Sequence, residues 1–335
     1  MLDLSQIKQH ILSSLNQHAL EIIPHSVGGN NRIFSFSTDA DDYIIKYYSP
    51  NQKDDRNRIG REWCFLEYLH SKSITCVPRP IVKNTDKSFA ILSKIDGQSP
   101  TKETDRDHLV NVSVRFINKI NTNLDPYLKG NVTHAFEHNL NISNTLLNVQ
   151  KRFQHLRQFN STKDSQLHDI ITEAENKLAV KAAEIEATRG CDHDLTEVLS
   201  QSQLCLSPSD FGFHNLLLEE TDNPYFIDFE YAGWDDPAKL ICDFILHPAN
   251  QLTDLETKLF LQSIQLPMIN RERCKYAYGV FALKWVAIIL NIFLPEQLNR
   301  KQFSNPDLNV EAEKIYRLKK SERMLEKTDI NPFNT

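Results

Sequence analysis

The chain has 335 residues, of which 40% are hydrophobic and 24% are charged, as in an ordinary globular protein with one large domain or two smaller ones. A formal net charge of −6 argues against a nucleic-acid-binding surface, and because no basic leader precedes an apolar run at the start, we expect no signal peptide. The six cysteines are scattered without a C-x-x-C pair, which indicates free thiols in a cytoplasmic protein.

The nine glycines exclude several familiar motifs. Only Gly28 and Gly29 lie near each other in the sequence. The chain therefore lacks the Gly-x-Gly-x-x-Gly of Rossmann domains, the Gly-x-Ser-x-Gly of hydrolases and the Gly-Lys of the Walker P-loop.

The first 48 residues predict a helix followed by three short strands. Apolar residues at roughly helical spacing over residues 2–15 indicate an amphipathic helix, and β-type runs follow at 22–23, 33–37 and 43–48. Between the first two runs, Gly28 and Gly29 let backbone N–H groups approach an anion closely, which suits nucleotide phosphates. The same turn would equally serve a simple hairpin.

Lys46 stands inside the third strand between Ile45 and Tyr47, where a lysine needs a partner. The next helix offers Glu62 beside its apolar stripe, and Glu67 further round the helix is the alternative. We expect Lys46 to pair with Glu62, although an ordinary surface ion pair would fit the same spacing.

After two further β-type runs at 81–82 and 89–92, the sequence becomes mainly helical from residue 105 to residue 198. A strongly apolar stretch at 277–294 is short and is interrupted by Lys284 and Asn291. It therefore favours a buried helix over a membrane span, and we expect no membrane partner. Residues 310–327 predict a charged amphipathic helix.

The stretch 204–234 carries the residues that suit catalysis best. Apolar strands alternate with polar loops there, and the loops hold Asp210, Asn215 and Asp228. Asp210 is suited to accept a proton from a substrate hydroxyl, while Asn215 and Asp228 offer the hard oxygen ligands that magnesium prefers. A solvated loop with chance spacing is the alternative.

Asp210-x-x-x-x-Asn215 followed by Ile227-Asp228-Phe229-Glu230 resembles the catalytic and metal loops of protein-kinase-like enzymes. Because Glu230 stands where protein kinases have Gly and no Ala-Pro-Glu follows, the pattern is most similar to the aminoglycoside phosphotransferase and choline kinase family. The chain departs from that family at Pro208-Ser209, where His-Gly is usual, which puts the bracing of the loop in doubt.

The resemblance implies an α+β fold with two lobes, a small N-terminal antiparallel sheet with one helix (residues 1–96) and a larger, mostly helical C-terminal lobe (residues 97–335). It implies an enzyme that uses ATP and Mg and moves the γ-phosphate to a hydroxyl of a small molecule. The residues it assigns to the nucleotide are Gly28 and Gly29 over the phosphates, Lys46 held by Glu62, and the backbone near Ser93 and Ile95 at the adenine.

The acceptor is less well defined. Glu230 and Asp235 would favour a cationic amino sugar or amino alcohol, and Trp285 would stack on a sugar ring or a quaternary amine. Ordinary loop and core packing explains these residues equally well.

Two other functions fit parts of the sequence. A kinase-like protein that binds nucleotide with little catalysis would explain Pro208-Ser209. A zinc hydrolase would use His134-Ala135-Phe136-Glu137-His138, which matches H-x-x-E-H, provided that the segment is a helix that turns both histidines to one metal.

Overall fold

The computed structural model describes residues 3–25, 31–48, 57–124, 132–138, 140–159, 165–191, 194–266, 269–304 and 307–334. The chain forms two compact units, each assembled from segments far apart in the sequence. Unit 1 contains Met1–Thr104, Asn123–Phe136 and Pro208–Gly233, and unit 2 contains Asp105–Thr122, Glu137–Ser207 and Trp234–Thr335. The lobe boundary expected between residues 96 and 97 stays a prediction.

Unit 1 is built on a five-stranded antiparallel sheet with the strand order β1-β2-β3-β5-β4. Since β3 is the central strand, Lys46 has a neighbour on each side, Ile33 on β2 and Ala90 on β5. The strands are β1 (Glu21–Pro24), β2 (Asn31–Ser37), β3 (Asp42–Tyr48), β4 (Pro80–Asn84) and β5 (Phe89–Ser93).

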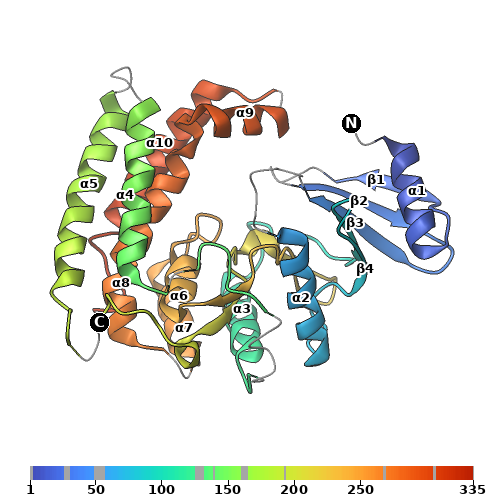
Figure 1. Cartoon of the computed structure of the whole chain (residues 1–335), viewed down its shortest axis with the longest axis horizontal. Helices are drawn as coiled ribbons and strands as arrows, with labels where there is room; N and C mark the ends of the chain where they lie inside the picture. The colour runs from blue at the N-terminus through green and yellow to red at the C-terminus, as the bar shows by residue number, and fades with distance from the viewer. Residues whose placement is uncertain are drawn as a thin grey trace. The chain divides into compact units, whose positions relative to one another are not determined.

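Two helices accompany this sheet. Helix α1 (Leu4–Leu15) begins with a capping box in which the Asp3 side chain accepts a hydrogen bond from the Gln6 N–H. Its buried residues Ile7 and Ile11 pack against apolar side chains of β2, β3 and β5, and Figure 1 shows the helix lying against the sheet. Helix α2 (Arg58–Ser71) contacts β4 and buries Glu62.

The segment Pro208–Gly233 completes unit 1. A short 3-10 helix, η3 (Phe213–Asn215), leads into a hairpin of β7 (Leu216–Leu218) and β8 (Pro224–Phe226). The hairpin register places Leu216 opposite Phe226. Asn215 and Asp228 are thereby brought to the same end of the hairpin, since each lies just beyond one of its strands.

Unit 2 is mostly helical, with α4, α5, α8 and α10 packed side by side (Figure 1). The apolar stretch at 277–294 lies in a helical segment from Arg271 to Phe293, which is long and apolar enough to span a membrane. In the protein, 72% of its most apolar window is buried, which confirms the expected buried helix. The elements are α3 (Arg106–Ile120), α4 (Ile142–Phe159), α5 (Ser165–Glu186), η2 (Gln201–Gln203), β6 (Cys205–Ser207), β9 (Gly233–Asp235), α6 (Pro237–Leu246), α7 (Asp254–Ser263), α8 (Arg271–Ile289), η4 (Leu290–Phe293), α9 (Pro295–Ser304) and α10 (Val310–Glu326).

An antiparallel sheet near the N-terminus and a mostly helical remainder confirm the predicted α+β class. All six cysteines are free thiols.

Candidate active site

Lys46 is the centre of a buried charge cluster in unit 1. Its side chain is 5% exposed, and its Nζ donates to Glu62 Oε2 at 2.7 Å and to Asp228 Oδ1 at 2.6 Å. The ion pair expected from the sequence is therefore present, whereas the alternative partner Glu67 is exposed. The sequence did not predict that Lys46 also bonds Asp228 directly.

Glu62 holds more than the lysine. Its Oε2 also accepts a hydrogen bond from the Tyr48 hydroxyl at 2.6 Å, and its Oε1 accepts from the Phe229 N–H at 3.3 Å. The Phe229 ring packs against Phe65 on α2, with 5.2 Å between ring centroids. Helix α2 thus fixes both Lys46 and the backbone that follows Asp228. Tyr48 could have been found from the sequence, because residues two apart on a strand share a face.

Glu230 belongs to the same cluster. It is 2% exposed, accepts a hydrogen bond from Asn31 Nδ2 at 2.8 Å, and lies 3.6 Å from the guanidinium of Arg58. These surroundings enclose the carboxylate and do not favour the acceptor contact that we expected of Glu230. Asn31 and Arg58 gave no signal in the sequence, since each is far from Glu230 along the chain.

The electrostatics of the cluster follow from its burial. Burial by itself lowers the pKa of Lys46, but the carboxylates of Asp228 and Glu62 outweigh it and raise the pKa well above its usual value. Burial raises the pKa of Glu230, and Lys46 only partly offsets this. Lys46 therefore stays a cation at neutral pH, stabilised by the surrounding carboxylates.

The loops that carry Asp210 and Asp228 are joined through Asn215. Asn215 Nδ2 donates to the backbone carbonyl of Asp210 at 2.9 Å, and the Asn215 carbonyl accepts from the Ile227 N–H at 3.0 Å. Asp228 has a φ of 67°, a left-handed conformation that aspartate tolerates better than most residues. The side chains of Asp210 and Asp228 are 39% and 37% exposed, so small molecules can reach both.

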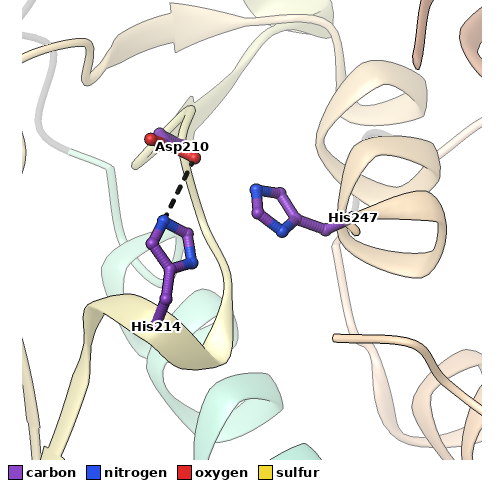
Figure 2. Close-up of side chains that lie close together, drawn as sticks. All are labelled: Asp210, His214 and His247. Carbon is purple, nitrogen blue, oxygen red and sulfur yellow. Dashed lines mark ion pairs between the residues drawn. The ribbon is translucent and has the colours of Figure 1, made fainter. Parts of the chain in front are cut away.

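Pro208-Ser209 does not leave this loop without support. Ser209 adopts a φ of 69°, and its carbonyl accepts from the Phe211 N–H at 3.0 Å. His214, to which the sequence gave no role, places Nε2 3.6 Å from Asp210 Oδ1 (Figure 2). A tight turn and a neighbouring imidazole thus stand beside Asp210.

The donor set beside Lys46 fits magnesium. Because the Asn215 Nδ2 faces Asp210, the amide oxygen is turned the other way, and Asp228 is a partly exposed carboxylate. Both are hard oxygen donors of the kind that binds magnesium next to phosphates. Asn215 and Asp228 are thus the residues that could hold the ion.

The remaining nucleotide residues are less informative. Ser93 ends β5, its N–H donates to the Arg79 carbonyl at 2.9 Å, and Ile95 lies half-buried two residues later. Their contact with adenine stays a prediction. Gly28 and Gly29 lie outside the described residues.

The two expected acceptor residues of unit 2 have partners of their own. Asp235 is fully buried and accepts a hydrogen bond from Lys239 Nζ at 2.6 Å. Trp285 donates from Nε1 to Asp243 at 3.0 Å. As with Glu230, this burial and pairing favour a structural role over contact with an acceptor.

The H-x-x-E-H segment is not the helix that a zinc site would need. His134 forms an isolated bridge, Phe136 and Glu137 form a turn, and Glu137 has a φ of 54°, opposite in sign to that of a right-handed helix. Glu137 instead forms an ion pair with Arg152.

Comparisons with known proteins agree with this fold. The choline kinase LicA from Streptococcus pneumoniae matches with a TM-score of 0.58 and 15% identity over 96% of this chain and 98% of its own. The spectinomycin phosphotransferase APH(9)-Ia, in complex with ADP and spectinomycin, gives 0.64 and 11% over 96% and 98%. A ternary complex of APH(2")-IIa with streptomycin and ATP gives 0.59 and 16% over 97% and 99%.

These similarities confirm the predicted protein-kinase-like fold. No curated protein sequence matches the chain. The phosphotransferase enzyme family matches residues 21–250, which is more than half of the 335 residues and includes Lys46, Asp210 and Asp228. The chain belongs to the phosphotransferase enzyme family.

Proposed function

We propose that this protein is an ATP- and Mg-dependent phosphotransferase that moves the γ-phosphate to a hydroxyl of a small molecule. The observation that carries the proposal is the position of Lys46, whose ammonium lies between the carboxylates of Glu62 and Asp228. Glu62 is enclosed and Asp228 is partly exposed, so Glu62 can fix the position of the lysine while its ammonium binds phosphates on the side of Asp228. Family membership supports the same activity.

In this proposal five polar side chains of unit 1 each have one task. Lys46 binds the nucleotide phosphates, and Glu62 orients it. Asn215 and Asp228 hold magnesium, which when bound neutralises charge on the phosphates. Asp210 orients the acceptor hydroxyl and receives its proton, so the site works by positioning and charge compensation.

The acceptor classes that we propose are amino sugars, sugars and amino alcohols. Support for these classes comes from proteins of the same fold, which include a choline kinase and a spectinomycin phosphotransferase. A cytoplasmic location, where ATP is available, fits the six free cysteines.

The decisive experiment measures ATP turnover with magnesium against aminoglycosides, choline, ethanolamine and free sugars. Asp210→Asn should lower the turnover of the responsive acceptor by about 10²- to 10⁴-fold, because it removes the proton acceptor while keeping the shape of the side chain. Asp222→Asn is the matched control, since Asp222 is exposed on the turn of the same β7–β8 hairpin.

Turnover by Asp210→Asn near the wild-type rate would refute the role of Asp210. ATP binding without transfer to any acceptor would instead favour a nucleotide-binding protein with little catalysis, the alternative suggested by Pro208-Ser209.

A further inference from the structure

Unit 2 contains a cavity of about 320 Å³ among α4, α6 and α8, bordered by the turn at Glu137. At about 30 Å³ for each water molecule, this volume corresponds to about ten waters of liquid. It also lies within the size range of sites for small ligands, which begins at about 300 Å³. The cavity is therefore large enough for a compact organic molecule.

Two buried lysines line the cavity. Lys239 on α6 is 2% exposed and Lys284 on α8 is 8% exposed. Lys239 bonds Asp235 at 2.6 Å and lies 3.5 Å from Asp243, while Lys284 bonds Asp243 at 3.1 Å. Burial lowers the pKa of Lys239, but Asp235 and Asp243 outweigh it and raise the pKa above its usual value, so this lysine remains charged.

The two lysines belong to the cavity lining, whereas the acids that hold them do not contribute to it among the described residues. An ammonium group has three N–H donors, and the contacts with Asp235 and Asp243 do not require all three of them on either lysine. Lys239 and Lys284 thus bring cationic side chains to the cavity wall, while their acid partners hold them from outside the lining.

Thr145 supplies independent evidence for a ligand. It lies on α4, lines the same cavity and is 5% exposed, yet its hydroxyl oxygen has no hydrogen-bond partner among the described residues. A buried hydroxyl without a partner is uncommon, because it loses its water without compensation. A polar ligand in the cavity would satisfy it.

The rest of the lining limits the class of ligand. Arg152 and Glu137 form an ion pair at the border, so the formal charges of the lining are three cations against one anion. Phe281 provides an apolar wall, and Lys284 Nζ lies 5.3 Å from the centre of its ring. A donor-rich lining with more cationic than anionic side chains and one apolar side suits a small molecule that carries an oxyanion.

We propose that this cavity binds a small organic anion, whose carboxylate or phosphate is held by Lys239, Lys284 and Thr145. The site lies wholly within unit 2 and does not depend on the phosphotransfer proposed for unit 1.

The test is isothermal titration calorimetry of the full chain with malonate and, separately, with inorganic phosphate at millimolar concentrations. Binding of one equivalent of either probe is expected, and the probe that binds more tightly identifies the oxyanion. Lys284→Gln should weaken binding by about ten- to a hundredfold, because it removes a charged donor. Thr145→Val should weaken it by about tenfold without lowering stability, because it removes a hydroxyl that has no partner in the protein.

Lys275→Gln is the matched control, since Lys275 lies on the same helix α8 but its side chain is 39% exposed. It should leave binding unchanged. The proposal is overturned if neither probe binds the wild type, or if both Lys284→Gln and Thr145→Val bind the probe as tightly as the wild type does.

Discussion

For the buried cluster around Lys46, we predict that Glu62→Gln destabilises the wild type but stabilises a variant that lacks the lysine. In the wild type, Glu62 accepts from Lys46, Tyr48 and the Phe229 N–H. Glu62→Gln keeps the shape of the side chain but replaces one carboxylate oxygen by an NH₂ group. At least one of the three donors therefore loses its acceptor. Loss of a hydrogen bond to a charged group costs about 1.5–3 kcal/mol, and the free energy of unfolding should fall by that amount.

Lys46→Met should cost more, about 3–5 kcal/mol, because it leaves the carboxylates of Glu62, Asp228 and Glu230 together without their cation. In the Lys46→Met background, Glu62→Gln removes one of these crowded acids. It should therefore stabilise the protein there, although it destabilises the wild type. The coupling between the two positions is therefore expected to exceed the cost of Glu62→Gln in the wild type, which is about 1.5–3 kcal/mol.

Urea unfolding of the wild type, both single variants and the double variant measures this cycle. Because two units need not unfold in one transition, exchange of the α2 amide hydrogens provides a local readout of unit 1. If Glu62→Gln lowers stability equally in both backgrounds, within about 0.5 kcal/mol, then Lys46 and Glu62 are not coupled and the argument from their ion pair fails.

Three further predictions concern single sites. Asp228→Asn should lower the free energy of unfolding by about 1.5–3 kcal/mol, because it removes a carboxylate that bonds the buried Lys46. Asp228→Ala should lose about a further 1–2 kcal/mol in urea unfolding, because alanine tolerates the left-handed φ of 67° poorly; equal stabilities of the two variants would contradict this. Lys284 and Lys239 outweigh burial and lower the pKa of Asp243 in the folded state. The stabilising effect of Asp243 should therefore be present above the unfolded pKa of 3.8 and be lost as the pH falls through the folded value. In unfolding measured from pH 7 to pH 3, Asp243→Asn should be less stable than the wild type at pH 7 and should lose less of its stability as the pH falls. Gly233→Ala should lower the melting temperature, because the added Cβ would lie 2.3 Å from the Thr133 carbonyl oxygen and the backbone would have to shift to relieve the clash. An unchanged melting temperature would disprove that contact.

Local chemistry made the centre of the site predictable. A lysine inside an apolar strand needs a carboxylate, and the nearest helix with a glutamate beside its stripe supplied Glu62. Likewise, Asn215 and Asp228 flank a hairpin whose turn residues are visible in the sequence. Both inferences use short spacings, within which geometry follows from the helix or strand period. The roles of these residues in phosphotransfer stay predictions.

The surroundings of the outer acids were not predictable in the same way. Glu230 is enclosed by Asn31, which is 199 residues away in the sequence, and no periodicity relates the two positions. Asp235 is different, because Lys239 lies four residues from it, and that spacing was available as a sign of a local ion pair. An exposed acidic loop and a buried ion-paired one have the same composition, and only the tertiary contacts distinguish them.

The contact between Lys46 and Asp228 joins residues that are 182 positions apart, and this distance affects how the protein is made. At about 5–20 residues per second, a ribosome needs about 9–36 s to reach Asp228 after it has added Lys46. During that interval the N-terminal sheet is present without the segment 208–233 that completes unit 1. While residues 137–207 of unit 2 are synthesised, the nascent chain therefore offers Lys46 its partner Glu62 but not Asp228, and a chain released before residue 233 lacks part of unit 1. Co-translational folding of this protein cannot proceed one finished unit at a time from the N-terminus.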